Sequence, residues 1–243
     1  MSILRVTDLD VRYGQFRAVR DVSFNVEQGE ILAIVGANGA GKTTLLRALA
    51  GANPVKAGTV HLSGTDITHM PSHLRVASGL ALVPEGRKLF LDMTVEENLK
   101  LGRTVGRMGD WTVERIFETF PNLVKRRHAA TGTMSGGEQQ ATAIGRALMS
   151  NPDVLILDEV SLGLSPLVVD QVYASLEGLM TTGTTIILVE QDLSRAMAVA
   201  DRVVCMLEGH VVLDSPMGAT TREAITAAYF GTEAQAGPQG EHA

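Results

Sequence analysis

A lysine and a threonine close a glycine-rich loop near the start of the chain, in the pattern G-x-x-x-x-G-K-[ST]. The loop covers residues 36–43 and directly follows an apolar run at residues 31–35. Its three glycines let the backbone aim successive N–H groups at phosphate oxygens, and a helix that begins after the loop adds its positive end. Lys42 supplies a positive charge for the β- and γ-phosphates, and Thr43 a hydroxyl for Mg²⁺. The loop therefore predicts binding of a nucleoside triphosphate.

Two adjacent carboxylates end a second apolar run. Residues 154–157 are apolar and are followed by Asp158 and Glu159. Ligands collect at the carboxyl ends of strands in open α/β sheets. At such a position Asp158 can hold Mg²⁺ directly or through water, and Glu159 is free to orient or deprotonate an attacking water. Together with the phosphate loop, the pair predicts hydrolysis of the bound nucleotide.

A second anion-binding signal lies far from the first in the sequence. Ser135, Gly136 and Gly137 place a hydroxyl and flexible backbone at the predicted start of a helix, and Glu138 follows as a capping acid. By itself this pattern is a common helix cap. Its presence beside a phosphate loop raises the question of what the second site holds.

The predicted elements place these motifs on strands and at the starts of helices. Short strands dominate the first 30 residues, helices dominate residues 86–151, and strands alternate with helices from residue 154. Such alternation implies a mainly parallel sheet covered by helices. The predicted strands are 4–11, 18–26, 31–35, 58–62, 80–83, 185–189 and 203–207, with a further strand at 154–158; the predicted helices are 42–50, 95–101, 112–120, 123–129, 137–150 and 192–199, with another from residue 166.

Composition indicates one α/β protein of ordinary type. The chain has 243 residues, a net charge of −6, and one cysteine, Cys205, which cannot form an internal disulfide. The acidic balance gives no electrostatic footprint for nucleic acid. No apolar run is long enough to span a bilayer, and the first residues lack a signal-peptide pattern. We therefore expect a cytoplasmic protein that serves a membrane, if at all, as a peripheral subunit.

Across residues 4–231 the chain resembles the ATP-binding subunit of ABC transporters. The loop at 36–43 matches that family's Walker A motif, and residues 155–158 match Walker B, with Glu159 as the catalytic glutamate. Residues 134–140 match the family's signature motif, with Met134 where leucine is usual. In this family the signature of one subunit covers the ATP held by the Walker A motif of another. The resemblance therefore implies that the serine-glycine site receives the γ-phosphate of a partner's nucleotide.

The resemblance also implies a domain plan. Residues 1–231 would form one ABC ATPase domain with the P-loop NTPase fold, an antiparallel β region at its N-terminus and a helical insertion at about 86–151. Residues 232–243 lack apolar content and are expected to be a disordered tail.

Single positions acquire implied roles in the same way. Tyr13 falls where the family stacks an aromatic ring on adenine, Gln191 where most members carry the switch histidine, and Glu85 at the glutamine of the Q-loop. The implied catalytic residues are Glu159 and Gln191; the implied metal ligands are Thr43, Glu85 and Asp158; the implied ATP contacts are Tyr13, Gly36, Ala37, Asn38, Gly39, Ala40, Gly41, Lys42, Thr43, Thr44, Ser135, Gly136, Gly137 and Glu138.

Further stretches narrow the type of transporter. Residues 83–87, 93–99, 132–140, 143–149, 161–166 and 188–191 resemble importers of branched-chain amino acids, which use two different ATP-binding subunits; this chain is similar to the shorter one. The implied partners are a second ABC ATPase subunit (a different chain or a second copy), two permease subunits facing the region around Arg87, and indirectly a solute-binding protein, on the inner face of the cell membrane. Importers of urea, short amides or other amino acids share much of this pattern and remain alternatives.

Three positions depart from the broad family pattern. Glu85 replaces a glutamine and adds negative charge near the phosphates. Gln191 replaces histidine, and an amide can hydrogen-bond a γ-phosphate but cannot take a proton. Val160 replaces the proline that usually follows the catalytic glutamate, and we have no functional account of it.

Two other ABC-type roles and one unrelated class of protein fit the sequence less well than import. ATPases of DNA maintenance separate Walker A from the signature by long coiled coils, which the sequence lacks. A nucleotide-gated regulator that does not depend on hydrolysis has only Gln191 in its favour. A GTPase is disfavoured because the Asn-Lys-x-Asp motif expected for guanine recognition is missing.

Overall fold

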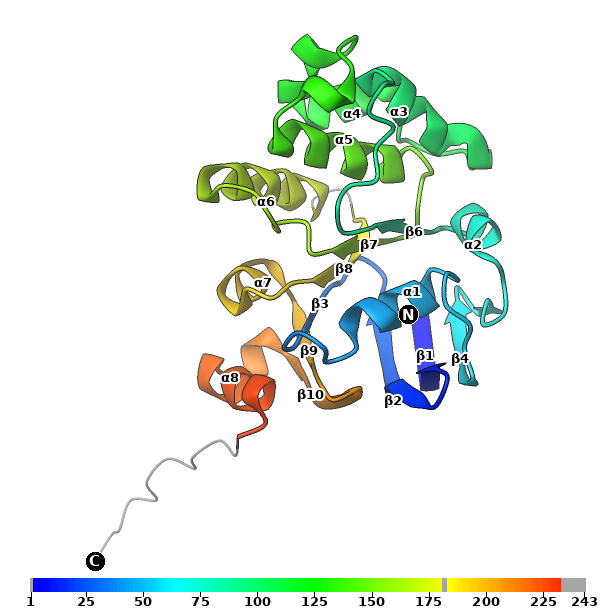
Figure 1. Ribbon diagram of the computed structural model, residues 1–243, viewed down its shortest axis with the longest axis vertical. Coiled ribbons are helices and arrows are strands. Elements are labelled where there is room, and N and C mark those ends of the chain that lie inside the picture. The colour runs from blue at the N-terminus through cyan, green and yellow to red at the C-terminus, as the bar shows by residue number, and fades with distance from the viewer. Residues whose placement is uncertain (1, 181–182, 233–243) are drawn as a thin grey trace, which may run out of the picture.

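The computed structural model describes residues 2–180 and 183–232. The predicted disordered tail lies almost entirely outside these ranges. A six-stranded sheet of order β10-β9-β3-β8-β7-β6 runs through the middle of the molecule (Figure 1), and all its neighbouring strands are parallel except β10, which is antiparallel to β9. Its strands are β3 (Ile31–Val35), β6 (Leu80–Val83), β7 (Val154–Asp158), β8 (Thr185–Val189), β9 (Arg202–Leu207) and β10 (His210–Pro216).

A smaller antiparallel sheet lies beside the first, with helix α1 between them (Figure 1). Its order is β2-β1-β4-β5, and β1 and β2 form a hairpin whose turn joins Tyr13 to Phe16. The predicted α/β fold with a mainly parallel sheet and an N-terminal antiparallel region is confirmed. These elements are β1 (Ser2–Tyr13), β2 (Phe16–Glu27), α1 (Lys42–Leu49), β4 (Ala57–Leu62) and β5 (Thr65–Asp66).

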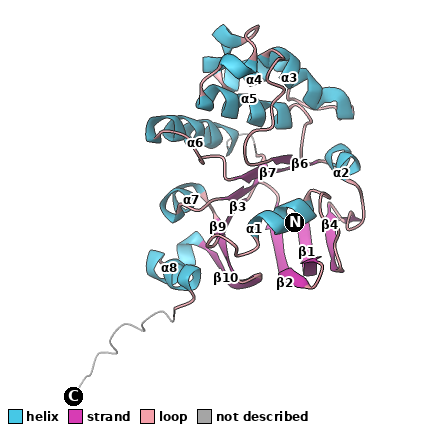
Figure 2. Cartoon of the chain, in the orientation of Figure 1, coloured by secondary structure: helices cyan, strands magenta, loops and turns pink. Residues whose placement is uncertain are grey.

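Helices form a layer on the other face of the six-stranded sheet (Figure 2). Most of them come from the stretch between β6 and β7; that this stretch is a separate subdomain stays a prediction. The elements between the two strands are α3 (Val95–Gly102), α4 (Val113–Thr119) and α5 (Gly136–Leu148), with 3₁₀ helices η1 (Arg103–Val105), η2 (Pro121–Arg126) and η3 (Thr131–Thr133); α6 (Pro166–Met180) follows β7 and α7 (Leu193–Val199) follows β8.

Side chains of the central strands alternate between two hydrophobic cores. Leu155 and Leu157 of β7 pack into the core under the helical layer, whereas Val154 and Ile156 pack with α1 and the antiparallel sheet. This is the period of two that a strand buried on both faces imposes. Helices α1 and α5 therefore lie on opposite faces of the sheet, as Figure 1 also shows.

One predicted helix, at residues 123–129, is wrong. The chain there forms the 3₁₀ helix η2 and then a turn, where Arg127 O accepts a hydrogen bond from Glu96 N at 3.1 Å and Ala129 O one from Val95 N at 3.2 Å. Pairing with the start of α3 thus replaces helical hydrogen bonds. The sequence analysis also missed β5, β10, α2 (Ser72–Ser78), η4 (Met217–Ala219) and α8 (Arg222–Phe230).

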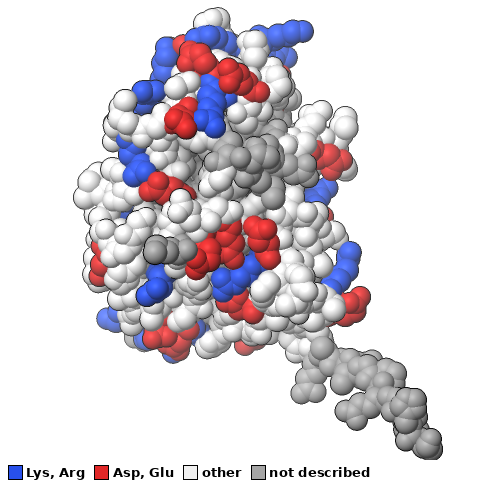
Figure 3. Space-filling view, turned by 180° about the vertical axis from the view of Figure 1, so that it is seen from behind, with Lys and Arg blue, Asp and Glu red and all other residues white. Residues whose placement is uncertain are grey.

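Acidic and basic side chains lie side by side over the rear face of the molecule (Figure 3). Among the residues that the structure describes, no helix is both long enough and apolar enough to cross a membrane.

Candidate functional site

The carboxyl ends of three parallel strands bring the predicted site residues to one edge of the sheet. Val189 of β8 pairs with Ile34 of β3 on one side and with Asp158 of β7 on the other. The glycine-rich loop follows β3, Glu159 follows β7 and Gln191 follows β8. Motifs more than 100 residues apart in the chain therefore meet at this edge, as expected for an open α/β sheet.

Two glycines of the loop occupy positions that no larger residue fits. Gly36 has φ 153°, and a Cβ there would lie 2.3 Å from Met206 O; Gly41 has φ 103°, and its Cβ would lie 2.4 Å from Ala18 O. Both backbones lie against neighbouring strands, so the loop turns tightly into the start of α1. The N-terminus of α1, with the glycine-rich backbone before it, is suited to bind an anion.

Lys42, the first residue of α1, is buried within the loop. Its Nζ donates to Gly36 O at 2.6 Å and to Ala37 O at 3.2 Å. Burial lowers the pKa of Lys42, while the negative charges of Glu159 and Asp158 act in the opposite direction. The ammonium group thus lies between the loop and the two carboxylates, where a bound polyphosphate needs a positive charge.

Asp158 ends β7, and its carboxylate is buried. Its Oδ1 is buried without a hydrogen-bond partner among the described residues. Burial first, and then the charges of Glu159 and Glu85, raise the pKa of Asp158 to about 6. An unpaired buried carboxylate oxygen is costly unless a cation or water compensates it. The site therefore fits a hard divalent cation.

The number of carboxylates favours Mg²⁺ as that cation. The described ranges contain no cluster of three His, Cys, Asp or Glu side chains that could hold a metal on its own. Mg²⁺ usually binds through one or two carboxylates and completes its shell with phosphate oxygens and water. Asp158, with the half-buried Thr43 in the adjoining loop, suits this pattern.

Glu159 is held by the residue that replaces the usual switch histidine. Gln191 Nε2 donates to Glu159 Oε2 at 2.7 Å, and Glu159 N donates to Val189 O at 3.0 Å. Glu159 also has a φ of 47°, uncommon for a residue with a side chain. The carboxylate is therefore oriented by an amide donor that leaves it free to accept a proton.

A cavity of about 260 Å³ joins the loop to the β1–β2 hairpin. Tyr13 lies at its rim, 50% exposed, and Asn53 Nδ2 donates to Tyr13 Oη at 2.7 Å. Phe16, 62% exposed, lines the same cavity and was missed by the sequence analysis, although a second aromatic residue three positions after Tyr13 was a usable signal. The predicted residues that line this cavity are Tyr13, Asn38, Gly39, Gly41, Lys42, Thr43, Thr44 and Glu159.

The serine-glycine segment does not join this cavity. Ser135 caps α5 on the opposite face of the sheet: its Oγ accepts from Glu138 N at 3.3 Å, and Glu138 Oε2 accepts from Ser135 N at 2.9 Å. Arg126 Nε donates to Glu138 Oε1 at 3.0 Å. The structure therefore separates Ser135, Gly136, Gly137 and Glu138 from the phosphate loop of the same chain.

A buried carboxyl behind Glu159 also escaped the sequence analysis. Glu190 is 2% exposed, and Ser161 Oγ donates to its Oε2 at 2.8 Å. Burial raises the pKa of Glu190. The hydrogen bond ties the segment after Glu159 to the end of β8, so Glu190 helps to hold this segment in place.

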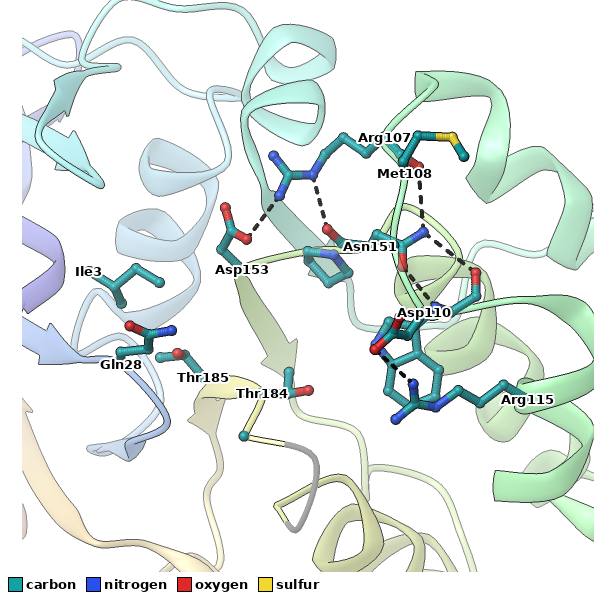
Figure 4. Close-up of a pocket in the computed structure, with 14 residues that line it drawn as sticks. Ile3, Gln28, Arg107, Met108, Asp110, Arg115, Asn151, Asp153, Thr184 and Thr185 are labelled. Carbon is teal, nitrogen blue, oxygen red and sulfur yellow. Dashed lines mark hydrogen bonds and ion pairs between the residues drawn. The ribbon is translucent and has the colours of Figure 1, made fainter.

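A second cavity, of about 270 Å³, lies at the other end of the strands (Figure 4). Arg107 donates to Asn151 O at 2.9 Å and to Asp153 Oδ1 at 2.9 Å, and Asn151 Oδ1 accepts from Trp111 N at 2.8 Å. Asn151 and Asp153 precede β7, so these bonds fasten the helical layer to the amino ends of the strands. This cavity is part of a structural junction, distant from the catalytic edge.

Comparisons with known proteins agree with this geometry. Residues 19–161 match the family model described as ABC transporter. The chain is 45% identical over 173 residues to the high-affinity branched-chain amino acid transport ATP-binding protein BraG of Pseudomonas aeruginosa, covering 70% of this chain and 74% of the relative. It is 36% identical to the probable branched-chain amino acid transport ATP-binding protein LivF of Archaeoglobus fulgidus, covering 70% and 73%.

A solved structure shows the same fold over nearly the full length. An ATP-binding cassette of an ABC transporter in its ADP conformation has a TM-score of 0.81 and 26% identity, covering 95% of each chain. The family predicted from the motifs is confirmed. The chain belongs to the ABC transporter family, and it is an ATPase of that family.

Proposed function

We propose that the chain powers the import of branched-chain amino acids, or of a related small polar solute, by hydrolysing ATP next to permease subunits. The solute class rests on the resemblance of residues 83–87, 93–99, 132–140, 143–149, 161–166 and 188–191 to such importers and on the 45% identity to the Pseudomonas protein. The edge of the sheet where β3, β7 and β8 end carries the residues proposed for ATP hydrolysis, and we call it the catalytic edge. Together they favour a peripheral subunit on the cytoplasmic side of a membrane.

The residues at this edge have different proposed roles in ATP binding and hydrolysis. Tyr13, with Phe16 beside it, offers aromatic surface for adenine, while the loop amides and Lys42 hold the phosphates. Asp158 and Thr43, with Glu85 nearby, would hold Mg²⁺, which would supply positive charge near the phosphate oxygens. Glu159, oriented by Gln191, accepts a proton from the attacking water.

The proposed mechanism depends on the separation of the phosphate loop from the serine-glycine segment. The Walker A helix α1 and the signature helix α5 pack against opposite faces of the sheet. One chain therefore cannot surround a nucleotide with both, and two ATPase subunits are needed to complete each site. ATP that contacts both subunits favours the closed pair over the open one, and hydrolysis removes that preference. Opening and closing then drive the permeases.

Replacing the base tests the ATPase assignment. We expect Glu159→Gln to leave ATP affinity near that of the unchanged chain and to lower turnover by about 10²–10⁴-fold, the usual scale for a positioned base. Turnover is measured by phosphate release and affinity by equilibrium titration. Near-normal turnover in this variant would remove Glu159 from the base role.

Transport in vesicles tests the solute class. The chain is reconstituted with its permease, solute-binding and second ATPase subunits, and ATP-driven uptake of leucine is compared with uptake of urea and acetamide. We expect leucine uptake that the Glu159→Gln variant lacks. Uptake of urea or acetamide instead would assign one of the alternative solutes, and ATP binding without turnover in the full complex would indicate a regulator.

A further inference from the structure

An uncommon backbone segment follows Glu85. Gly86, Arg87 and Lys88 have φ of 74°, 63° and 48°, so three successive residues are left-handed. Glycine adopts this conformation freely, but arginine and lysine do so at a cost and usually only where surrounding contacts impose it. Arg87 N donates to Pro84 O at 3.2 Å and Lys88 N to Gly86 O at 2.6 Å, which closes the turn.

The turn directs Arg87 onto the first half of α5. Its Nε donates to Gln140 Oε1 at 3.3 Å and its Nη1 to Gln139 Oε1 at 3.1 Å. Arg146, also on α5, donates from its Nη2 to Arg87 O at 3.0 Å. Both the side chain and the backbone of Arg87 are therefore bound to the helix that begins at the signature.

The same guanidinium lies against the first turn of α5. A Cβ on Gly136 would lie 3.2 Å from Arg87 Nη2. Gln139, which accepts from Arg87, donates from its own Nε2 to Thr131 O at 2.9 Å and so extends the connection into the helical layer. The side chain of Arg87 is half-buried against its own chain.

We propose that Arg87 is a positioning residue that connects the Glu85 segment to the N-terminus of α5 and so fixes the signature relative to the catalytic edge. This inference rests on the proposed function, because the signature acts only on a partner's nucleotide. Arg87 touches no reacting group. It sets the orientation of Ser135, Gly136 and Gly137 through Gln139 and Gln140.

The chemistry of the side chain suits this role. A guanidinium presents donors in a rigid plane and can bond two acceptors at once, whereas the ammonium group of lysine is a point charge on a flexible stem. Both acceptors are neutral amide oxygens on consecutive residues of one helix. The side chain of Arg87 therefore links the segment around Glu85 to the signature helix by two hydrogen bonds rather than by long-range charge.

The test compares Arg87→Ala with Lys88→Ala in the reconstituted transporter. Lys88 is the neighbouring residue, carries the same charge and left-handed backbone, and is exposed. We expect Arg87→Ala to lower kcat by about 10- to 100-fold, the scale of a small misplacement in a catalytic site, and to leave the Kd of the purified chain for ATP within about twofold. Lys88→Ala should change neither quantity by more than about twofold.

Two further variants keep the test decisive if Arg87→Ala folds poorly. Gln139→Ala removes an acceptor and should lower kcat with Kd unchanged, and Arg87→Lys should not restore the rate. Amide hydrogen exchange at residues 135–140 should become faster in Arg87→Ala and Gln139→Ala and not in Lys88→Ala.

The outcomes separate this inference from the proposed function. An unchanged kcat in Arg87→Ala, or a Kd that rises as much as kcat falls, would overturn the positioning role while normal wild-type turnover leaves the ATPase assignment intact. If the wild-type transporter shows no turnover that depends on Glu159, the proposed function itself fails.

Discussion

Single residues at the catalytic edge carry negative charges that a bound cation would balance. Asp158 is buried near Glu159 and Glu85, and Lys42 is the cation buried among them. Such an arrangement is unfavourable for the isolated chain and favourable once a divalent cation and a polyphosphate are bound. Stability and activity should therefore respond in opposite directions to changes at Asp158.

Asp158→Asn should stabilise the metal-free chain at neutral pH and abolish Mg²⁺-dependent ATP hydrolysis. The pKa of Asp158 is raised from 3.8 to about 6 in the folded state. At a pH between these two values, the folded state therefore holds a proton that the unfolded state has released. The wild-type stability therefore falls as pH rises from about 4 to about 6 and then levels off. The difference between the variant and the wild type should grow over the same range, to at most about 3 kcal/mol.

Urea unfolding between pH 4 and pH 7, without Mg²⁺, measures this difference. A gap between the variant and the wild type that stays constant across this range, or that widens as pH falls, would contradict the assignment of the raised pKa to Asp158.

At the scale of elements, helices α3 and α5 have the same kind of N-terminal capping box, but only one of them starts at a predicted anion site. Ser135 and Glu138 cap α5, and Thr94 and Glu97 cap α3, each pair with reciprocal hydrogen bonds. Only α5 begins at the signature. The cap at Thr94 is therefore a matched reference that separates the structural value of a capping hydroxyl from a role in hydrolysis.

Ser135→Ala and Thr94→Ala should each lower the free energy of unfolding by about 1 kcal/mol, the usual cost of losing an N-cap side chain. Turnover of the assembled transporter should fall by at least about tenfold in Ser135→Ala, because the proposed hydrogen bond of its hydroxyl to a partner's γ-phosphate would be lost. Turnover should be unchanged in Thr94→Ala. Thermal unfolding and phosphate release measure the two effects, and equal turnover in both variants would show that Ser135 acts only as a cap.

At the scale of the whole molecule, the sheet separates the two halves of the machinery. Its alternating side chains build one core with α1 and another with α5. Under the proposed mechanism, the positive ends of these helices serve different nucleotides, and a site is completed only by association, which ATP would strengthen by contacting both partners.

The Glu159→Gln chain should associate in an ATP-dependent manner, because it binds nucleotide without consuming it. We expect light scattering to show a mass near twice that of the chain with MgATP, either alone or with a second ATPase subunit, and the single mass without nucleotide. Adding Ser135→Ala to this variant should weaken the association. Equal association of both variants would place the signature outside the interface.

Some residues of the site could be predicted from the sequence and others could not. The phosphate loop, Asp158 and Glu159 were predictable because their spacing and flanking strands already require that chemistry. Glu190 was not, since its role depends on a strand pairing that brings it to the site, and Phe16 was indicated only by its spacing from Tyr13. The helix predicted at 123–129 failed because pairing with α3 outweighs local helical preference.

The sequence by itself determined the family, the order of the motifs and the type of chemistry, because glycine loops and strand-end carboxylates carry their function in local pattern. Only the tertiary structure decided which motifs meet. Strand register brought Lys42, Asp158, Glu159 and Gln191 together at one edge. The two-sided packing of the sheet kept Ser135 apart from them, and a left-handed turn connected Arg87 to the signature helix. These relations arise from contacts between distant segments, which no local pattern encodes.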